Sequence, residues 1–410
     1  MEVFISLLIV FALILAGLRF KLGLGLTLIL ASLALGLLFS VSFSGIIAAF
    51  GNTLIEKDLT GSFVTIELIG VLFFISLLEI IMRKSGAFTR LFGSIGYFIK
   101  DTRKVTVFFP VLMGTLPSAG GARFSAPLTG QAAQGLNLSA EKKSFTNYWF
   151  RHIWEPVFPL YPGIILAAAL CKVTVGDFGR QQLIYPVFMV IAGWIIAFWG
   201  VPKLLHPADT GKKKREHLFY FFEGLFPIIL ILVAVLAFKL PLIISLIGVI
   251  AAHLVIYKEG RKNLKGNLKE ALKLDIVFLI LGVMFFKNML AVSGAVERMV
   301  QFFIIMKLPL TVVLFTLPFL AGLLTGVVQA YVAIIFPLIL PLITAGGNIN
   351  MPLLSFAFIS GYCGVLISPV HLCYLLTCDY FETDINRVYK YLIPLALALP
   401  VIGFLLIKIL

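Results

Sequence analysis

Long apolar runs separated by short polar segments recur along the whole chain, and the first three cover residues 3–17, 23–40 and 63–81. A helix of about 20 apolar residues crosses the ~30 Å hydrocarbon layer of a membrane. Backbone groups in lipid must be satisfied within their own segment, so we predict that these runs are transmembrane helices. Arg19, Lys21 and another apolar run follow the first run, in place of a small-residue cleavage site. This pattern indicates a retained span rather than a removed signal peptide.

The pattern repeats along the chain. The tripeptide Ser-Gly-Ala occurs at 85–87 and again at 293–295, followed in each case by an arginine three residues later. Three further pairs of similar segments occur in the same order, namely 109–114 with 317–322, 70–74 with 282–286, and 155–157 with 368–370. Single matches between Leu-rich helices arise by chance, but four ordered pairs at nearly one offset indicate a duplication.

The most polar stretch, residues 203–217, carries a Lys-Lys-Lys-Arg cluster and is interpreted as a cytoplasmic basic linker. The first transmembrane repeat then covers 1–202, with a hairpin near 105–138, and the second covers 218–410, with a hairpin near 308–343. Each half is interpreted as five crossings, an odd number, so the second half should be inverted. We predict an all-α polytopic membrane protein of two inverted-topology repeats, with about ten transmembrane helices plus two re-entrant hairpins.

Composition and charge agree with a membrane protein. Hydrophobic residues make up 60% of the chain and charged residues 13%, whereas soluble domains carry about 25% charged residues. The net charge is +14, but Lys and Arg lie at the ends of apolar runs rather than in one stripe, which argues against a nucleic-acid partner. With the N-terminus outside, cytoplasmic segments hold roughly threefold more Lys and Arg in total. We expect a multi-pass protein of the cytoplasmic membrane, in contact with lipid, with both termini outside.

The first hairpin is predicted from its length. Only twelve apolar residues, 105–116, precede the sequence Pro-Ser-Ala-Gly-Gly-Ala-Arg at 117–123, and they reach about 18 Å as a helix, little more than half of the hydrocarbon core. The return limb, 124–138, is small and polar, which suits protein rather than lipid. The counterpart tip lies within 322–330 and enters from the opposite face, although its first limb is longer.

Interrupted backbone at membrane depth persists only where protein buries it or where it lines a wet cavity. Glycines at the tips let the backbone turn, and the helix that starts after each tip presents its positive dipole end, which favours an anion. Arg123 is a candidate clamp for a carboxylate or phosphate. Side-chain hydrogen bonds are expected from Thr115, Ser118, Thr325 and Gln329. The alternative is that the small residues only allow close helix packing.

The spans after the two hairpins each contain a proline within a long apolar segment. Pro156 lies in Glu-Pro-Val-Phe-Pro, and Pro369 lies between Ser368 and Val370-His371. Proline removes a backbone hydrogen bond, and interruptions at corresponding positions of two halves are the sequence pointer to a transporter's site. The alternative is a simple proline kink at each position.

Charged residues inside apolar segments cost about 2.5–3.5 kcal/mol at a helix centre, so each requires a partner or a role. Glu155 and Glu67 are candidates to carry a coupling proton or cation. An internal ion pair between Arg123 and Glu155, without substrate contact, is the alternative. Arg151 and Lys287 are interpreted as side chains that extend to the membrane interface.

Metal chemistry receives little support from the sequence. His152 precedes Glu155 by three residues, a spacing that can place both on one helix face, but this signal is weak alone. His371 is interpreted as a pore or packing residue. The four cysteines lack metal-ligand or redox spacing and are interpreted as small buried side chains. We therefore predict no metal site, and no cofactor apart from Na⁺ or H⁺ as a coupling ion.

The arrangement resembles the ion-transporter superfamily of secondary carriers, which includes sodium/dicarboxylate, citrate and gluconate transporters. The tract at 114–124 is similar to an uncharacterised branch of that group, known only as a domain of unknown function. The resemblance implies paired hairpin tips and broken helices that hold an organic anion and coupling ions, in a homodimer that moves by an elevator mechanism. It points to the tip residues Thr115, Ser118, Gly120, Gly121, Thr325, Gly326 and Gln329. The Ser-Asn-Thr tip of the dicarboxylate carriers is absent from both hairpins, which puts sodium coupling and a dicarboxylate substrate in doubt.

Together these features predict an ion-coupled secondary active transporter of a small anionic organic metabolite, and not an enzyme. The expected substrate-binding residues also include those of the two interruptions: Pro156, Ser368, Pro369 and His371. A membrane-embedded enzyme and a passive channel or lipid translocase on the same fold are the alternatives.

Overall fold

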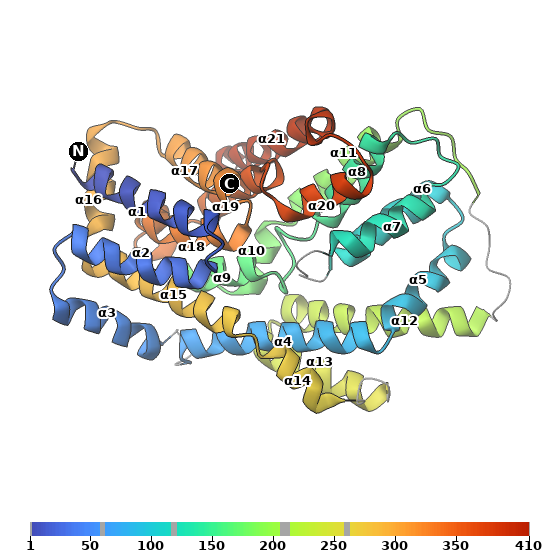
Figure 1. Ribbon diagram of the computed structural model, residues 1–410, viewed down its shortest axis with the longest axis horizontal. Helices are drawn as coiled ribbons and strands as arrows, with labels where there is room; N and C mark the ends of the chain where they lie inside the picture. The colour runs from blue at the N-terminus through green and yellow to red at the C-terminus, as the bar shows by residue number, and fades with distance from the viewer. Residues whose placement is uncertain (1, 58–61, 116–120, 206–213, 258–262, 410) are drawn as a thin grey trace.

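The protein is built almost entirely of helices (Figure 1). The structure is a computed structural model that describes residues 2–57, 62–115, 121–205, 214–257 and 263–409. Two short strands, β1 (Thr344–Ala345) and β2 (Asn348–Ile349), pair antiparallel around a glycine turn. The chain therefore forms an all-α polytopic membrane protein, as predicted.

The first half runs from α1 to α11. Its helices are α1 (Glu2–Arg19), α2 (Leu24–Leu38), α3 (Phe43–Ile55), α4 (Val64–Lys84), α5 (Ala87–Phe98), α6 (Thr102–Met113), α7 (Ala122–Ala132), α8 (Ala140–Arg151), α9 (Pro162–Leu170), α10 (Val175–Gln181) and α11 (Ile184–Phe198). Of these, α6 and α7 form the predicted hairpin. The sequence did not predict α3 or α10 as separate helices.

The second half runs from α12 to α21. Its helices are α12 (Lys214–Leu232), which continues as the π-helical turn η1 (Val233–Ala237), α13 (Leu242–Ile256), α14 (Leu264–Ala271), α15 (Leu274–Val292), α16 (Ala295–Ile305), α17 (Leu310–Thr325), α18 (Val328–Ile339) with the 3₁₀ turn η3 (Leu340–Ile343), α19 (Met351–Leu366), α20 (Leu372–Tyr380) and α21 (Ile385–Ile409). The second hairpin is formed by α17 and α18. Most of the basic linker, residues 206–213, lies outside the described residues.

The starts of α5 and α16 have the same local structure. The serine before each start, Ser85 or Ser293, donates from Oγ to the carbonyl three residues earlier and accepts from the N–H two residues later. The glycine that follows it is left-handed in both, with φ of 71° at Gly86 and 64° at Gly294. This agreement is what the duplication predicts, while the inverted orientation of the halves stays a prediction.

Within the part of the chain that the structure describes, four helical stretches are long and apolar enough to cross a membrane: Val64–Lys84, Lys214–Ala237, Leu264–Val292 and Ile385–Ile409. The pair α9 and α10 passes the same test together, with a bend of 109°. Eight further apolar helices are shorter. The prediction of about ten crossings therefore holds only if the shorter helices also serve as spans or as halves of interrupted spans.

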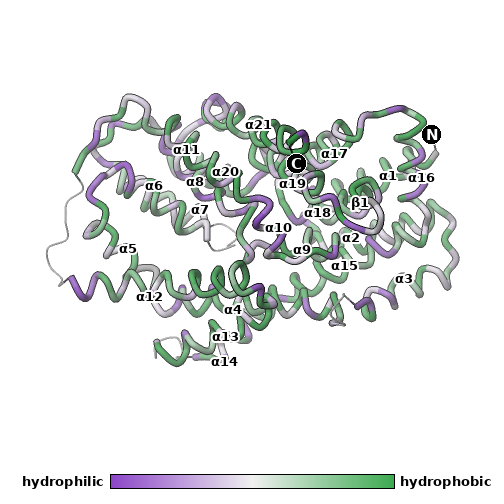
Figure 2. Tube along the Cα trace, turned by 180° about the vertical axis from the view of Figure 1, so that it is seen from behind, coloured by the Kyte–Doolittle hydropathy of each residue, from purple (hydrophilic) through white to green (hydrophobic). Residues whose placement is uncertain are grey.

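The two hairpins lie toward opposite ends of the long axis of the molecule, and α3, α4 and α12 run along one long edge (Figure 1). Hydrophobic residues predominate in most of the helices, and hydrophilic residues gather at helix ends such as the start of α12 (Figure 2). Residues 330–339 of α18 and 354–366 of α19 are buried at every position. The centre of the protein is thus made from a hairpin limb and an interrupted span rather than from the long helices.

Two charged side chains were interpreted as extending to the membrane interface. Arg151 is buried, with 3% of its surface exposed, so that interpretation was wrong for Arg151. Lys287 forms a half-buried ion pair with Glu56, with Nζ and Oε1 2.5 Å apart, and its extension to an interface stays a prediction. A buried charge requires a partner nearby, and Glu56, 231 residues away in the chain, provides it for Lys287.

The two halves pack together most closely where α2 crosses α15. Gly25 and Gly282 face each other there, and a Cβ on either would overlap backbone atoms of the opposite helix. Small residues at such a crossing let two membrane helices approach to backbone contact. This crossing joins the N-terminal helices to the second half.

We predict that Gly282→Val lowers the thermal stability of the purified protein in detergent, because overpacking a close contact costs typically 1–3 kcal/mol. The matched control is Gly248→Val in α13, where a Cβ would meet no atom within 4 Å. Melting temperatures measured by tryptophan fluorescence should fall for the first variant and change little for the second. Equal melting temperatures would contradict the assigned contact.

Candidate functional site

The first hairpin tip is held by the interrupted segment that joins α8 to α9. Trp154 donates from Nε1 to the carbonyl of Val111 at 3.0 Å, and Tyr161 donates from Oη to the carbonyl of Gly114 at 2.6 Å. Gly114 packs directly on the carbonyl of Arg151, where any side chain would overlap it. The chain from 152 to 161 is a series of turns rather than a helix, so the interruption is more than a proline kink.

The second tip is held in the same way by the segment between α19 and α20. Ser368 donates from Oγ to the carbonyl of Leu323 at 2.6 Å. His371 lies with Nδ1 2.8 Å from the carbonyl of Gly326. Gly326 ends α17 with φ of 64°, a left-handed conformation that glycine adopts without steric cost. Each interrupted span therefore supplies the donors for the hairpin of its own half.

This arrangement follows from the chemistry of helix ends. The last four carbonyls of a helix have no partner within it, and a buried group without a hydrogen bond costs about 1–3 kcal/mol. In water the solvent would satisfy them. Here α6 and α17 end inside the protein, and side chains from the interrupted spans donate instead.

Hydrogen bonds also join the two halves next to the two interruptions. Tyr362 in α19 donates to the carbonyl of His152 at 2.5 Å, and Tyr148 in α8 donates to the carbonyl of Leu366 at 2.9 Å. Each hairpin also contacts the interrupted span of the opposite half, because α7 packs on α20 and α18 packs on α9. Gly163, at the start of α9, lies directly against Val328, at the start of α18. The two tips and the two interruptions therefore form one connected structure.

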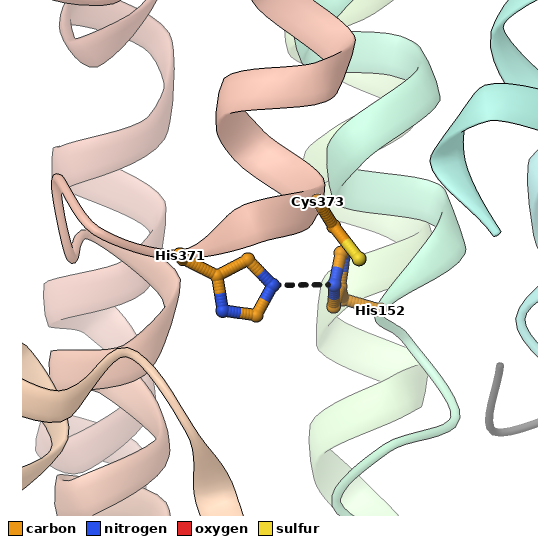
Figure 3. Close-up of side chains that lie close together, drawn as sticks. All are labelled: His152, His371 and Cys373. Carbon is orange, nitrogen blue, oxygen red and sulfur yellow. Dashed lines mark hydrogen bonds between the residues drawn. The ribbon is translucent and has the colours of Figure 1, made fainter. Parts of the chain in front are cut away.

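A cluster of polar side chains lies between the two interruptions. His152 follows α8 and His371 precedes α20, and their Nε2 atoms are 3.2 Å apart (Figure 3). The sulfur of Cys373, on the first turn of α20, completes a group whose ligand atoms all lie within 4.8 Å of one another. Glu155 Oε2 is 3.9 Å from His152 Nε2. The charge of the buried Arg151 acts on both Glu155 and His371.

Four helices begin directly after the tips and the interruptions. They are α7 and α18, which follow the tips, and α9 and α20, which follow the interruptions. Gly163, at the start of α9, lies against Val328, at the start of α18. Tyr161 and His371, which precede α9 and α20, contact the ends of α6 and α17, and α7 packs on α20. Each helix start carries unpaired backbone N–H groups and a positive dipole end. The local field therefore favours negative charge.

The hydroxyls of Thr115 and Thr325 are both engaged with backbone. Thr115 donates to the carbonyl of Leu112 and Thr325 to that of Ala321, each at 2.7 Å. A hydroxyl has one proton, so in this conformation both can only accept a further hydrogen bond. An anion would therefore depend on backbone N–H groups and cationic side chains rather than on these two residues.

The other predicted site residues are placed as follows. Gly121 precedes α7 and is buried, Gln329 lies half-buried in the first turn of α18, Pro156 is buried and Pro369 is exposed. Ser118 and Gly120 lie outside the described residues. Arg123 is in the first turn of α7, but its side chain is not among those that the structure describes. The predicted ion pair between Arg123 and Glu155 accordingly stays a prediction.

Glu67 lies in a different cavity. This cavity, of about 370 Å³, is lined by α4, α9, α10 and α13, and its lining contains none of the residues of the tips or interruptions named above. Three acidic residues there, Glu56, Glu67 and Asp177, face the basic residues Lys172, Arg180 and Lys239. The two predicted ion-coupling residues therefore occupy separate sites.

The cluster of His152, His371, Cys373 and Glu155 is called the central cluster below. Several residues in it or near it were not predicted. The donors Tyr161 and Tyr362, and Cys373 beside the histidines, carry no spacing signal, because their partners are distant in sequence. Ser125, in the first turns of α7, is fully buried and its Oγ has no hydrogen-bond partner among the described residues. Ser125 could have been predicted from the sequence, because it lies within the polar return limb of the predicted hairpin.

Interrupted spans and hairpins that meet in a protein core define a class of helical membrane protein, and the overall fold is shared with a solved example. The crystal structure of the Alcanivorax borkumensis YdaH transporter, described as having an unusual topology, matches with a TM-score of 0.59 and 13% sequence identity, over 90% of this chain and 87% of that chain. No curated protein matches the sequence.

The chain belongs to the family described as "Protein of unknown function (DUF401)", which matches residues 3–410. This confirms the predicted membership of an uncharacterised family over nearly the whole chain. The wider resemblance to the ion-transporter superfamily stays a prediction.

We predict that Gly326→Ala destabilises the protein more than a matched glycine variant does. The left-handed conformation costs alanine roughly 1–2 kcal/mol, and the new Cβ would also press on Ser368 and on the N–H of His371. Gly347→Ala is the control, because Gly347 has φ of 81° but a Cβ there would meet no atom within 4 Å. Thermal unfolding in detergent should show the larger loss for Gly326→Ala. Equal losses would show that the contact with the interruption is unimportant.

Proposed function

We propose that this protein is a secondary active transporter that moves a small anionic organic metabolite across the cytoplasmic membrane, driven by an ion gradient. The observation that carries the proposal is the meeting of two hairpin tips and two interrupted spans, from opposite halves, in the protein core. Helix breaks at corresponding positions of two halves form the substrate and ion sites of many carriers. The fold shared with the YdaH transporter supports the same class.

The anionic character of the substrate is supported by the local charge. Four helices, α7, α9, α18 and α20, begin directly after the tips and interruptions, and a helix start carries a positive dipole end. Arg151 is buried beside it, and Arg123 lies on the first turn of α7. Ser125 offers a buried hydroxyl on the same helix. A carboxylate or phosphate group suits this set of donors better than a cation or a neutral solute does.

Glu155 is the carboxylate best placed to respond to a coupling ion, H⁺ or Na⁺, because it borders both the first interruption and the histidine pair. Glu67, in the cavity between α4 and α9, is the second candidate. A homodimer with both termini outside completes the proposal. Its support is the distribution of Lys and Arg for the orientation and the resemblance to dimeric carriers for the assembly.

Counterflow in proteoliposomes tests the class of function. Vesicles loaded with an unlabelled organic anion should accumulate the labelled anion transiently, because a carrier exchanges one molecule for another. The anion is chosen beforehand as one that raises the melting temperature of the purified protein. A channel would equilibrate the label without overshoot, and an enzyme would convert it chemically. Either result, obtained with an anion that binds, would reject the proposal.

Arg123→Ala should reduce this uptake more than tenfold, because the proposal gives Arg123 the substrate anion as its charge partner, and loss of one partner of such a pair costs typically 2–5 kcal/mol. The control is Arg387→Ala, whose side chain is 73% exposed. Uptake is measured at equal amounts of folded protein, checked by gel filtration. Unchanged uptake by Arg123→Ala would remove this residue from the site.

A further inference from the structure

Both histidines of the central cluster have a fixed tautomer when neutral. His152 Nδ1 is 2.6 Å from the carbonyl oxygen of Tyr148, and His371 Nδ1 is 2.8 Å from that of Gly326. A carbonyl only accepts hydrogen bonds, so each Nδ1 must carry the proton. Each neutral ring then leaves a lone pair on Nε2. A histidine that donates from Nδ1 to a carbonyl and is free at Nε2 has the arrangement found in metal-ligating histidines.

The two Nε2 atoms face each other at 3.2 Å (Figure 3). Two lone pairs cannot form a hydrogen bond, so this contact requires positive charge between the rings. Cys373 brings its sulfur to the same point, and its ligand atom lies within 4.8 Å of both. His152 directly follows α8, whereas His371 and Cys373 lie at the start of α20, 219 residues or more further along the chain. The cluster is therefore created only by folding.

We infer that His152, His371 and Cys373 bind one divalent transition-metal cation of the Zn²⁺ class. Tetrahedral Zn²⁺ has bonds of about 2.0–2.1 Å to nitrogen and 2.3 Å to sulfur, which place neighbouring ligand atoms roughly 3.3–3.6 Å apart. The nitrogen separation already agrees with this geometry. Two imidazoles and a thiolate favour Zn²⁺ and similar ions over Na⁺ or Mg²⁺, which prefer oxygen ligands.

Three protein ligands leave the fourth position open, as in zinc sites that exchange a ligand. Glu155 lies close to this site, with Oε2 3.9 Å from His152 Nε2. A divalent cation and Arg151 contribute three positive charges, and the Cys373 thiolate and the Glu155 carboxylate contribute two negative ones. One positive charge therefore remains at the centre. The metal would tie the two interrupted spans together and would add to the attraction for an anion.

Cobalt(II) is the probe, because a thiolate ligand gives it a charge-transfer band in the near ultraviolet and tetrahedral geometry gives intense visible bands. Purified protein, freed of metal with a chelator, should bind one Co²⁺ per chain with both features. Zn²⁺ should displace the cobalt and raise the melting temperature. Cys373→Ser should lose the charge-transfer band, while Cys378→Ser, a buried cysteine on the same helix, should keep it.

His371→Asn separates metal binding from folding. Asparagine retains an N–H near the position of Nδ1 for the Gly326 carbonyl but has no atom at Nε2. This variant should melt near the temperature of the metal-free wild type and show at least a tenfold weaker affinity for Co²⁺. The inference fails if the wild type shows no thiolate band, if Cys373→Ser keeps it, or if the two rings prove to share a proton with no metal-dependent shift in melting temperature. These readouts do not depend on transport, so they can fail while counterflow succeeds.

Discussion

The structure depends on one constraint, that backbone interrupted inside an apolar core must find hydrogen-bond partners within the protein. Tyr161, Ser368 and His371 meet this constraint at the ends of α6 and α17. Without them, several carbonyls would be buried unpaired at the end of each hairpin limb. The broken helices are therefore stable only as a set, in which each interruption supplies the donors that the neighbouring tip lacks.

The same constraint gives the site its chemical character. A chain that stops and restarts in the core leaves the first N–H groups of the next helix without partners inside that helix, and four helices follow the tips and interruptions. Tyr362 and Tyr148 then join the two interruptions across the halves. These hydrogen bonds, with the packing of α7 on α20 and of α18 on α9, link the hairpins and interrupted spans of both halves.

Features that depend on nearby residues could be predicted from the sequence. The short limb before Pro117 indicated the hairpin, and the prolines at 156 and 369 indicated the interruptions. The Ser-Gly-Ala repeats at 85 and 293 indicated a duplication, which stays a prediction supported by the matching starts of α5 and α16. The pairing of His152 with His371 spans 219 residues, and that of Lys287 with Glu56 spans 231. No local spacing encodes such contacts. The same applies to Cys373, which carries no metal-ligand spacing in the sequence and joins the histidines only through packing of the two halves.

The proposed function places the substrate between the two hairpin tips, which requires a polar chamber there in the protein core. Thr325→Cys, at the end of α17, tests it in a chain whose four native cysteines are replaced by alanine. A hydrophilic thiol reagent should label this cysteine from one side of the membrane, and a transported anion should slow the labelling. Ala357→Cys, fully buried in α19, should stay unlabelled. If Thr325→Cys were unreactive from both sides, or were labelled as fast as a residue in bulk solvent whatever anion is present, the account would be contradicted.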